Sequence, residues 1–131
     1  MSYLVDTNIC IAFLKGEDAG VRDRLLALPP SDVCLCSVVK AKLLYGARNS
    51  THIEHNLRRL REFFEPFHSA AFDDEAAGAY GIVRAQLKRD RRPIGSNDLL
   101  IAAIALSNDM TLVTRNQDEF QCVPGLRLAM W

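Results

Sequence analysis

Short apolar runs alternate with longer helical patterns along this chain. The apolar run 3–5 ends in the polar triplet Asp6-Thr7-Asn8, and a helical pattern follows it as far as Gly16. A second buried-strand pattern covers residues 33–36, where Ser37 is placed to cap a helix that ends at Gly46. In both places we expect a strand that leads directly into a helix.

The remaining segments continue this alternation. Residues 19–28 predict a helix, and Thr51 is placed to cap an amphipathic helix that ends before Pro66. Its apolar positions recur at helical spacing and are Ile53, Leu57, Leu60 and Phe64. After them we expect a short strand within 67–72, a helix from Asp73 to Arg92, a strand at 110–114 and an edge strand near 126–128.

Residues 97–106 form the most apolar helical pattern in the chain. Ser96 is a good N-cap, so the helix is predicted to begin at Asn97 or Asp98 and to be buried on all sides. The Asp98 carboxylate then lies at the start of a buried helix, where it complements the helix dipole. Taken alone, Asp98 is better explained by this structural role than by a chemical one, and a second acidic residue beside it would shift the balance.

Alternating strands and helices predict a three-layer α/β/α domain with a short, mainly parallel central sheet. With 131 residues, 49% of them hydrophobic, the chain suits a single domain over residues 1–131. In such sheets, sites form beyond the carboxyl ends of the strands. Asp6, Ser37 and Asn116 each follow a predicted strand, so we expect them on one edge with Asp98 as a neighbour.

Charge and cysteine content limit the possible functions. Sixteen basic residues balance sixteen acidic ones, so any recognition of nucleic acid must depend on how the charges are distributed. The four cysteines form no C-x-x-C pair and are expected to be reduced core residues. No apolar run approaches the length of a membrane span and no leader pattern opens the chain, so we expect a soluble, cytoplasmic protein.

Two carboxylates held together on a dry sheet edge repel each other unless a proton or a cation lies between them. Mg²⁺ or Mn²⁺ is the natural cation, because both prefer oxygen ligands. Such an ion next to a phosphodiester activates water, so metal-dependent phosphodiester hydrolysis is the leading reaction. A cap on the following helix explains Asp6 equally well, and neither role excludes the other.

Four motifs carry a resemblance to a known family. Residues 5–8 (V-D-T-N), 43–47 (L-L-Y-G-A), 92–103 (R-P-I-G-S-N-D-L-L-I-A-A) and 112–116 (L-V-T-R-N) resemble, in order and spacing, the motifs of PIN-domain ribonucleases of the VapC toxin family. The resemblance implies the toxin of a type II toxin–antitoxin system, a Mg²⁺- or Mn²⁺-dependent endoribonuclease that cleaves structured RNA such as transfer RNA. It also implies a homodimer, a VapB-like antitoxin partner, and contact with operator DNA only through that antitoxin.

The same resemblance assigns the site. It places Asp6 and Asp98 as metal ligands, and Asn116 and Glu119 as further members of the acidic centre. Supporting roles fall to Thr7 and Ser37, which would orient the carboxylates, and to Asn97 within the matched motif.

Lys42 departs from the family pattern, because the family has a glutamate before the L-L-Y-G segment. An ammonium there disfavours a divalent cation and is able to take its place between the carboxylates. We therefore expect weakened or abolished cleavage. The alternative is a catalytically inactive PIN-fold module that binds antitoxin or RNA.

A basic rim for RNA is suggested by Arg91, Arg92 and Arg115. The commoner explanation of the run before Pro93 is a solvated helix end whose cations complement the helix dipole.

Overall fold

The computed structural model describes residues 2–131 and is an α/β structure built on one five-stranded sheet. The strands are β1 (Tyr3–Val5), β2 (Val33–Cys36), β3 (His68–Ala70), β4 (Thr111–Val113) and β5 (Leu128–Ala129). Their order is β3-β2-β1-β4-β5, and every neighbouring pair is parallel. The predicted three-layer class is confirmed, with a sheet that is parallel throughout.

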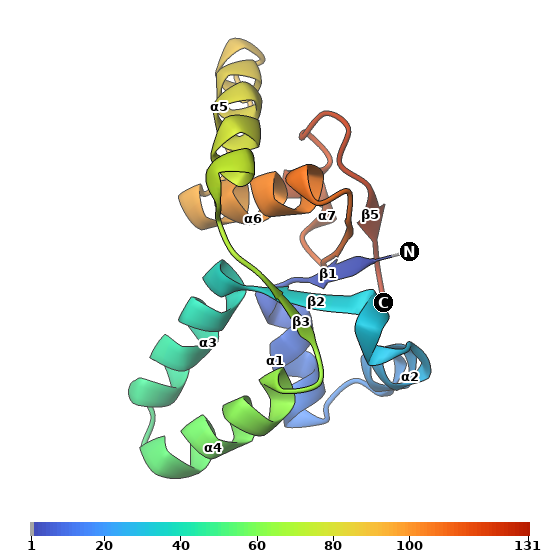
Figure 1. Cartoon of the computed structure of the whole chain (residues 1–131), viewed down its shortest axis with the longest axis vertical. Coiled ribbons are helices and arrows are strands. Elements are labelled where there is room, and N and C mark those ends of the chain that lie inside the picture. Colours follow the sequence, from blue (N-terminus) through green and yellow to red (C-terminus); the bar gives the residue numbers. More distant parts are fainter. Residues whose placement is uncertain (1) are drawn as a thin grey trace.

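Helices cover both faces of this sheet. They are α1 (Thr7–Lys15), α2 (Ala19–Ala27), α3 (Ser37–Arg48), α4 (Ile53–Phe64), α5 (Asp74–Arg89), α6 (Ser96–Ser107) and α7 (Gln117–Phe120), with a 3₁₀ turn at Pro30–Asp32. In Figure 1, α1, α3 and α4 lie on one side of the strands, while α6 lies on the other side with α5 projecting from it. Right-handed crossover helices place their layers in this way.

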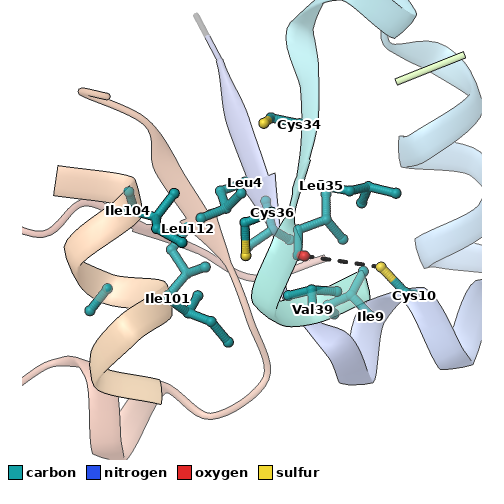
Figure 2. Packing of buried hydrophobic residues seen from close by; sticks show 14 of the residues in the cluster. Leu4, Ile9, Cys10, Cys34, Leu35, Cys36, Val39, Ile101, Ile104 and Leu112 are labelled. Atoms are coloured by element: carbon teal, nitrogen blue, oxygen red, sulfur yellow. Dashed lines mark hydrogen bonds between the residues drawn. The ribbon is translucent and has the colours of Figure 1, made fainter. Parts of the chain in front are cut away.

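The core lies on both sides of the central strands. Figure 2 shows Leu4 and Leu112 of the sheet next to Ile101 and Ile104 of α6, with Ile9 on the opposite side. All five side chains are fully buried. Strands β2 and β4 are buried at every position, as expected for a parallel sheet covered on both faces.

Several helix ends differ from the prediction. Helix α3 continues through Gly46 to Arg48, because a glycine inside a helix costs only about 1 kcal/mol and does not force an end. Helix α6 begins at Ser96, with Gly95 as its N-cap and no side-chain cap. Helix α3 likewise begins at Ser37 without a side-chain cap.

The amphipathic helix α4 also differs in detail. Its N-cap residue is His52 and not Thr51, and no side chain caps it. Leu57 and Leu60 are buried as predicted, but Phe63 takes the third buried position. Phe63 stacks on Phe13 with ring centroids 5.4 Å apart, so α1 selects which of the two adjacent phenylalanines turns inward.

Two helices end in the same backbone motif. At the end of α5, the Arg92 N–H donates to Leu87 O and the Arg91 N–H to Lys88 O, which is a Schellman motif. At the end of α6, Asp109 occupies the position that corresponds to Arg91. Arg91 and Asp109 have φ values of 55° and 54°, a left-handed conformation that costs a non-glycine residue about 1–2 kcal/mol.

Among residues 2–131, no helix combines the length and apolar composition that crossing a bilayer requires.

Candidate active site

Asp6 is a buried carboxylate at the carboxyl end of the central strand β1. It is 4% exposed and is the N-cap residue of α1. Its Oδ1 accepts from the Thr7 N–H at 2.8 Å, and its Oδ2 accepts from the Thr114 hydroxyl at 2.8 Å. The cap expected from the sequence is therefore present, and two hydrogen bonds fix the carboxylate in one orientation.

Thr114 continues this network from the end of β4. Its buried Oγ1 accepts from the Asn116 N–H at 3.0 Å while it donates to Asp6. The Asn116 side-chain amide in turn donates to Glu119 Oε2. Asp6, Asn116 and Glu119 are thus linked through one threonine, a residue that the sequence analysis did not single out although it lies within the matched L-V-T-R-N segment.

Asp98 and Glu119 approach each other around Gly95. The Gly95 N–H donates to Glu119 Oε1 at 2.6 Å. A Cβ at Gly95 would lie 3.4 Å from Asp98 Oδ2 and 3.5 Å from Glu119 Oε1. Both carboxylates therefore lie on the same side of the loop before α6, within van der Waals reach of this position.

The two carboxyl groups differ in proton affinity. Burial raises the pKa of Asp98 to about 6, and a hydrogen bond to the negatively charged Glu119 raises it as well. The Gly95 N–H holds the pKa of Glu119 below its usual value. Of this pair, Asp98 is the carboxyl group that more readily holds a proton.

Lys42 lies at the same centre, on the site-facing side of α3. Its Nζ is 4.0 Å from Asp98 Oδ1, and both side chains are partly buried. Lys42 is therefore paired with one of the expected site carboxylates. The ion pair reaches Asp98; among the described residues, no ion pair joins Lys42 to Asp6.

The residues expected to support the carboxylates are placed differently. Thr7 reaches Asp6 through its backbone N–H, while its buried Oγ1 has no hydrogen-bond partner. Ser37 and Asn97 are exposed. Each lies in the first turn of a helix, and within residues 2–131 no hydrogen bond joins either side chain to a site carboxylate.

The three arginines of the expected basic rim have different surroundings. Arg115 forms an ion pair with Asp18, so part of its charge is already neutralised. The Arg92 Nη1 lies 3.8 Å from Cys122 Sγ, and Arg91 is exposed at the end of α5. The acidic partner of Arg115 was missed because it lies 97 residues away in sequence.

A divalent ion does not fit this arrangement. The carboxylate oxygens of Asp6 and Asp98 are hard donors of the kind that Mg²⁺ and Mn²⁺ prefer. However, in the part of the chain that the structure describes, no three His, Cys, Asp or Glu side chains gather into a group able to hold a metal ion. The Lys42 ammonium beside Asp98 adds positive charge where a cation would bind.

Comparison with known proteins identifies the fold and its family. The family model of the PIN domain matches residues 3–126. This chain belongs to the PIN-domain family, in its VapC branch. It is 38% identical to the tRNA(fMet)-specific endonuclease VapC of Shigella flexneri over 131 residues, which cover 100% of this chain and 98% of that protein. It is 36% identical to ribonuclease VapC2 of Rickettsia felis, with the same coverage of each chain.

Solved structures agree with this PIN-domain assignment. VapBC2 of Rickettsia felis bound to a DNA fragment from its promoter superposes with a TM-score of 0.93 at 33% identity and covers 100% of this chain and 99% of that one. DNA-bound VapBC of Salmonella typhimurium also superposes with a TM-score of 0.93, at 34% identity, and covers 100% and 98% of the two chains.

Proposed function

We propose that this PIN domain is the toxin of a type II toxin–antitoxin system, an endoribonuclease directed at structured RNA, whose cleavage is weakened by Lys42. The ribonuclease relatives and the site at the carboxyl ends of the strands support the activity. One observation supports the weakening: the Lys42 ammonium lies 4.0 Å from Asp98 Oδ1.

The roles of the chain's own residues follow from their contacts. Asp6 is held by the Thr7 N–H and the Thr114 hydroxyl, so it keeps one geometry without rearrangement. Asn116 and Gly95 hold the Glu119 carboxylate beside Asp98. Lys42 neutralises Asp98 and lowers the negative potential that would attract a cation.

We propose Mg²⁺ or Mn²⁺ as the ion that the site takes when Lys42 is replaced by glutamate. That substitution changes the local charge by two units and adds a carboxylate to those of Asp6, Asp98 and Glu119. Four carboxylates and the Asn116 side-chain amide then supply the oxygen ligands that these ions prefer.

The test is RNA cleavage by Lys42→Glu and by the unsubstituted chain, each with Mg²⁺ or Mn²⁺ and with bacterial transfer RNA. We expect a rate at least about tenfold higher for Lys42→Glu, since one lost electrostatic interaction typically changes a rate by that factor or more. Lys40→Glu is the matched control. It makes the same charge change in α3, but the Lys40 ammonium lies 5.2 Å from the centroid of the Phe64 ring and outside the site.

Equal rates for all three proteins would contradict the proposed weakening. If Lys42→Glu and the unsubstituted chain both leave the RNA intact, the second candidate holds, namely a PIN-fold module that binds antitoxin or RNA without cleaving it. The Lys42–Asp98 pair is the observation that favours this candidate.

We also propose a VapB-like antitoxin as the partner, since the solved relatives are VapBC complexes. A groove of about 330 Å³ between α1, α3 and α4 suits an amphipathic helix or strand. Its lining combines apolar side chains with the cations Lys15, Lys42 and Arg59. We also propose that the chain forms a homodimer and that it contacts operator DNA only through the antitoxin.

A further inference from the structure

A second cavity lies between α5 and the start of α6, outside the acidic centre. Its volume is about 480 Å³, which is within the usual range of small-ligand pockets. Ser96 and Leu99 form part of its wall and flank Asp98 in sequence on the first turn of α6. The cavity and the acidic centre therefore share one helix end.

The charge of this cavity is of one sign. Its lining includes Arg84, Lys88 and Arg91 and, among the residues that the structure describes, no acidic residue. Among residues 2–131, none of these three cations takes part in an ion pair. In a chain of zero net charge, three unpaired cations around one cavity favour an anionic ligand.

The cavity also offers surfaces on which a base can stack. The Arg84 Nη1 donates to the Tyr80 hydroxyl at 2.8 Å, and its guanidinium carbon lies 5.8 Å from the centroid of the Tyr80 ring. Phe72 packs against the Tyr80 ring in an edge-to-face contact, with ring centroids 5.9 Å apart. Leu87 and Ile94 add apolar wall. Planar guanidinium and aromatic groups over an apolar wall are the features that hold unstacked bases.

The backbone conformation of Arg91 also points to a role for its side chain in this cavity. It occupies the left-handed position of the Schellman motif, where glycine is the favoured residue, and its side chain lines the cavity. Backbone strain of this kind is often retained where the side chain has a function.

From these features we infer that the α5–α6 cavity is a nucleotide subsite, which takes one unpaired nucleotide of the RNA adjacent to the nucleotide at Asp98. The base lies between the Tyr80–Arg84 pair and the apolar wall, and its phosphate binds Lys88 and Arg91. This inference rests on the proposed function, because it specifies how that RNA is held.

The decisive variant is Arg91→Gly, compared with Asp109→Gly. Both substitutions place glycine at a left-handed position that ends a helix, so the melting temperature of each variant should equal or exceed that of the unsubstituted chain. Only Arg91→Gly removes a cation of the cavity. We expect its affinity for labelled bacterial transfer RNA, measured by fluorescence anisotropy in EDTA, to fall about three- to tenfold, with the slope of log K against log salt smaller by about 0.7.

A second pair of variants tests the wall of the cavity. Arg84→Gln should weaken RNA binding by a similar factor, whereas Arg89→Gln should not, because Arg89 lies on the same helix but outside the cavity. Uridine and adenosine monophosphate should displace the RNA at lower concentrations than inorganic phosphate, because a base contacts Tyr80 and phosphate alone does not.

The outcomes separate the two proposals. If the unsubstituted chain binds no RNA, the proposed function fails and the subsite fails with it. If it binds RNA and both Arg91→Gly and Arg84→Gln bind equally well, the subsite alone is wrong. The subsite is also wrong if sedimentation shows that these variants lose RNA only where they lose self-association, since the cavity would then belong to an interface between copies.

Discussion

At the residue scale, Thr114 connects two parts of the acidic centre through a single hydroxyl. Its side chain is fully buried between the end of β4 and Asp6. The hydroxyl donates to the Asp6 carboxylate and accepts from the Asn116 N–H. Both partners lose a hydrogen bond if this oxygen is removed, and Asp6 has little water to replace it.

We predict that Thr114→Val lowers the free energy of unfolding by about 1–3 kcal/mol, because it leaves a buried carboxylate and a backbone N–H each short of a partner. Urea denaturation measures this change. Thr114→Ser is the control, since it keeps the hydroxyl and loses only a methyl group. A Thr114→Val protein as stable as Thr114→Ser would show that the hydroxyl is not a structural link.

At the scale of elements, α6 connects the acidic centre to the core. Every residue from Ile101 to Ala105 is buried, and Asp98 lies one turn before this segment. Ile101 and Ile104 pack against the sheet next to Leu112 (Figure 2). The position of Asp98 is therefore set by apolar contacts along the whole helix.

We predict that Ile101→Ala lowers the free energy of unfolding by about 2–5 kcal/mol, because it opens a cavity in a fully packed core. Ile82→Ala is the matched control. That isoleucine is 74% exposed on α5, so its truncation should change stability by no more than about 0.5 kcal/mol. Denaturant unfolding monitored by circular dichroism compares the two, and equal losses would contradict this account of the core.

The elements themselves were largely predictable from sequence, because local patterns determine them. The run 33–36 predicts a buried strand, and the acidic residues from Asp73 onward predict the start of a helix. Strand β2 lies at that run, and α5 begins at Asp74 with the Asp73 carboxylate accepting from the Ala76 N–H at 2.9 Å. Helix ends were less predictable. Gly46 lies inside α3, since burial of Leu43 and Ala47 on either side of it favours a continuous helix.

The positions of the candidate site residues were predictable where topology alone decides them. Asp6 and Asn116 both follow parallel strands, so the sheet brings them to one edge. Pairings between distant side chains were not predictable. The ion pair of Arg115 with Asp18 and the hydrogen bond of Glu119 with Gly95 join residues that no local pattern connects.

At the scale of the whole molecule, the neutral chain separates its charges by location. The acidic centre lies at the carboxyl ends of the strands, while three cations that form no ion pair within residues 2–131 line the neighbouring α5–α6 cavity. Lys42 is the exception, because it places a cation inside the acidic centre. We propose that this one side chain keeps a divalent ion out of the acidic centre.

The most direct test is calorimetric titration of Mn²⁺ into the unsubstituted chain and into Lys42→Glu. We predict that Mn²⁺ binds Lys42→Glu at least about tenfold more tightly than the unsubstituted chain, because a positive charge that repels the ion is replaced by a carboxylate that binds it. Lys40→Glu should bind Mn²⁺ as the unsubstituted chain does, which excludes a general effect of net charge. Equal Mn²⁺ affinities for the unsubstituted chain and Lys42→Glu would contradict the account, because Asp6 and Asp98 would then hold the ion despite Lys42.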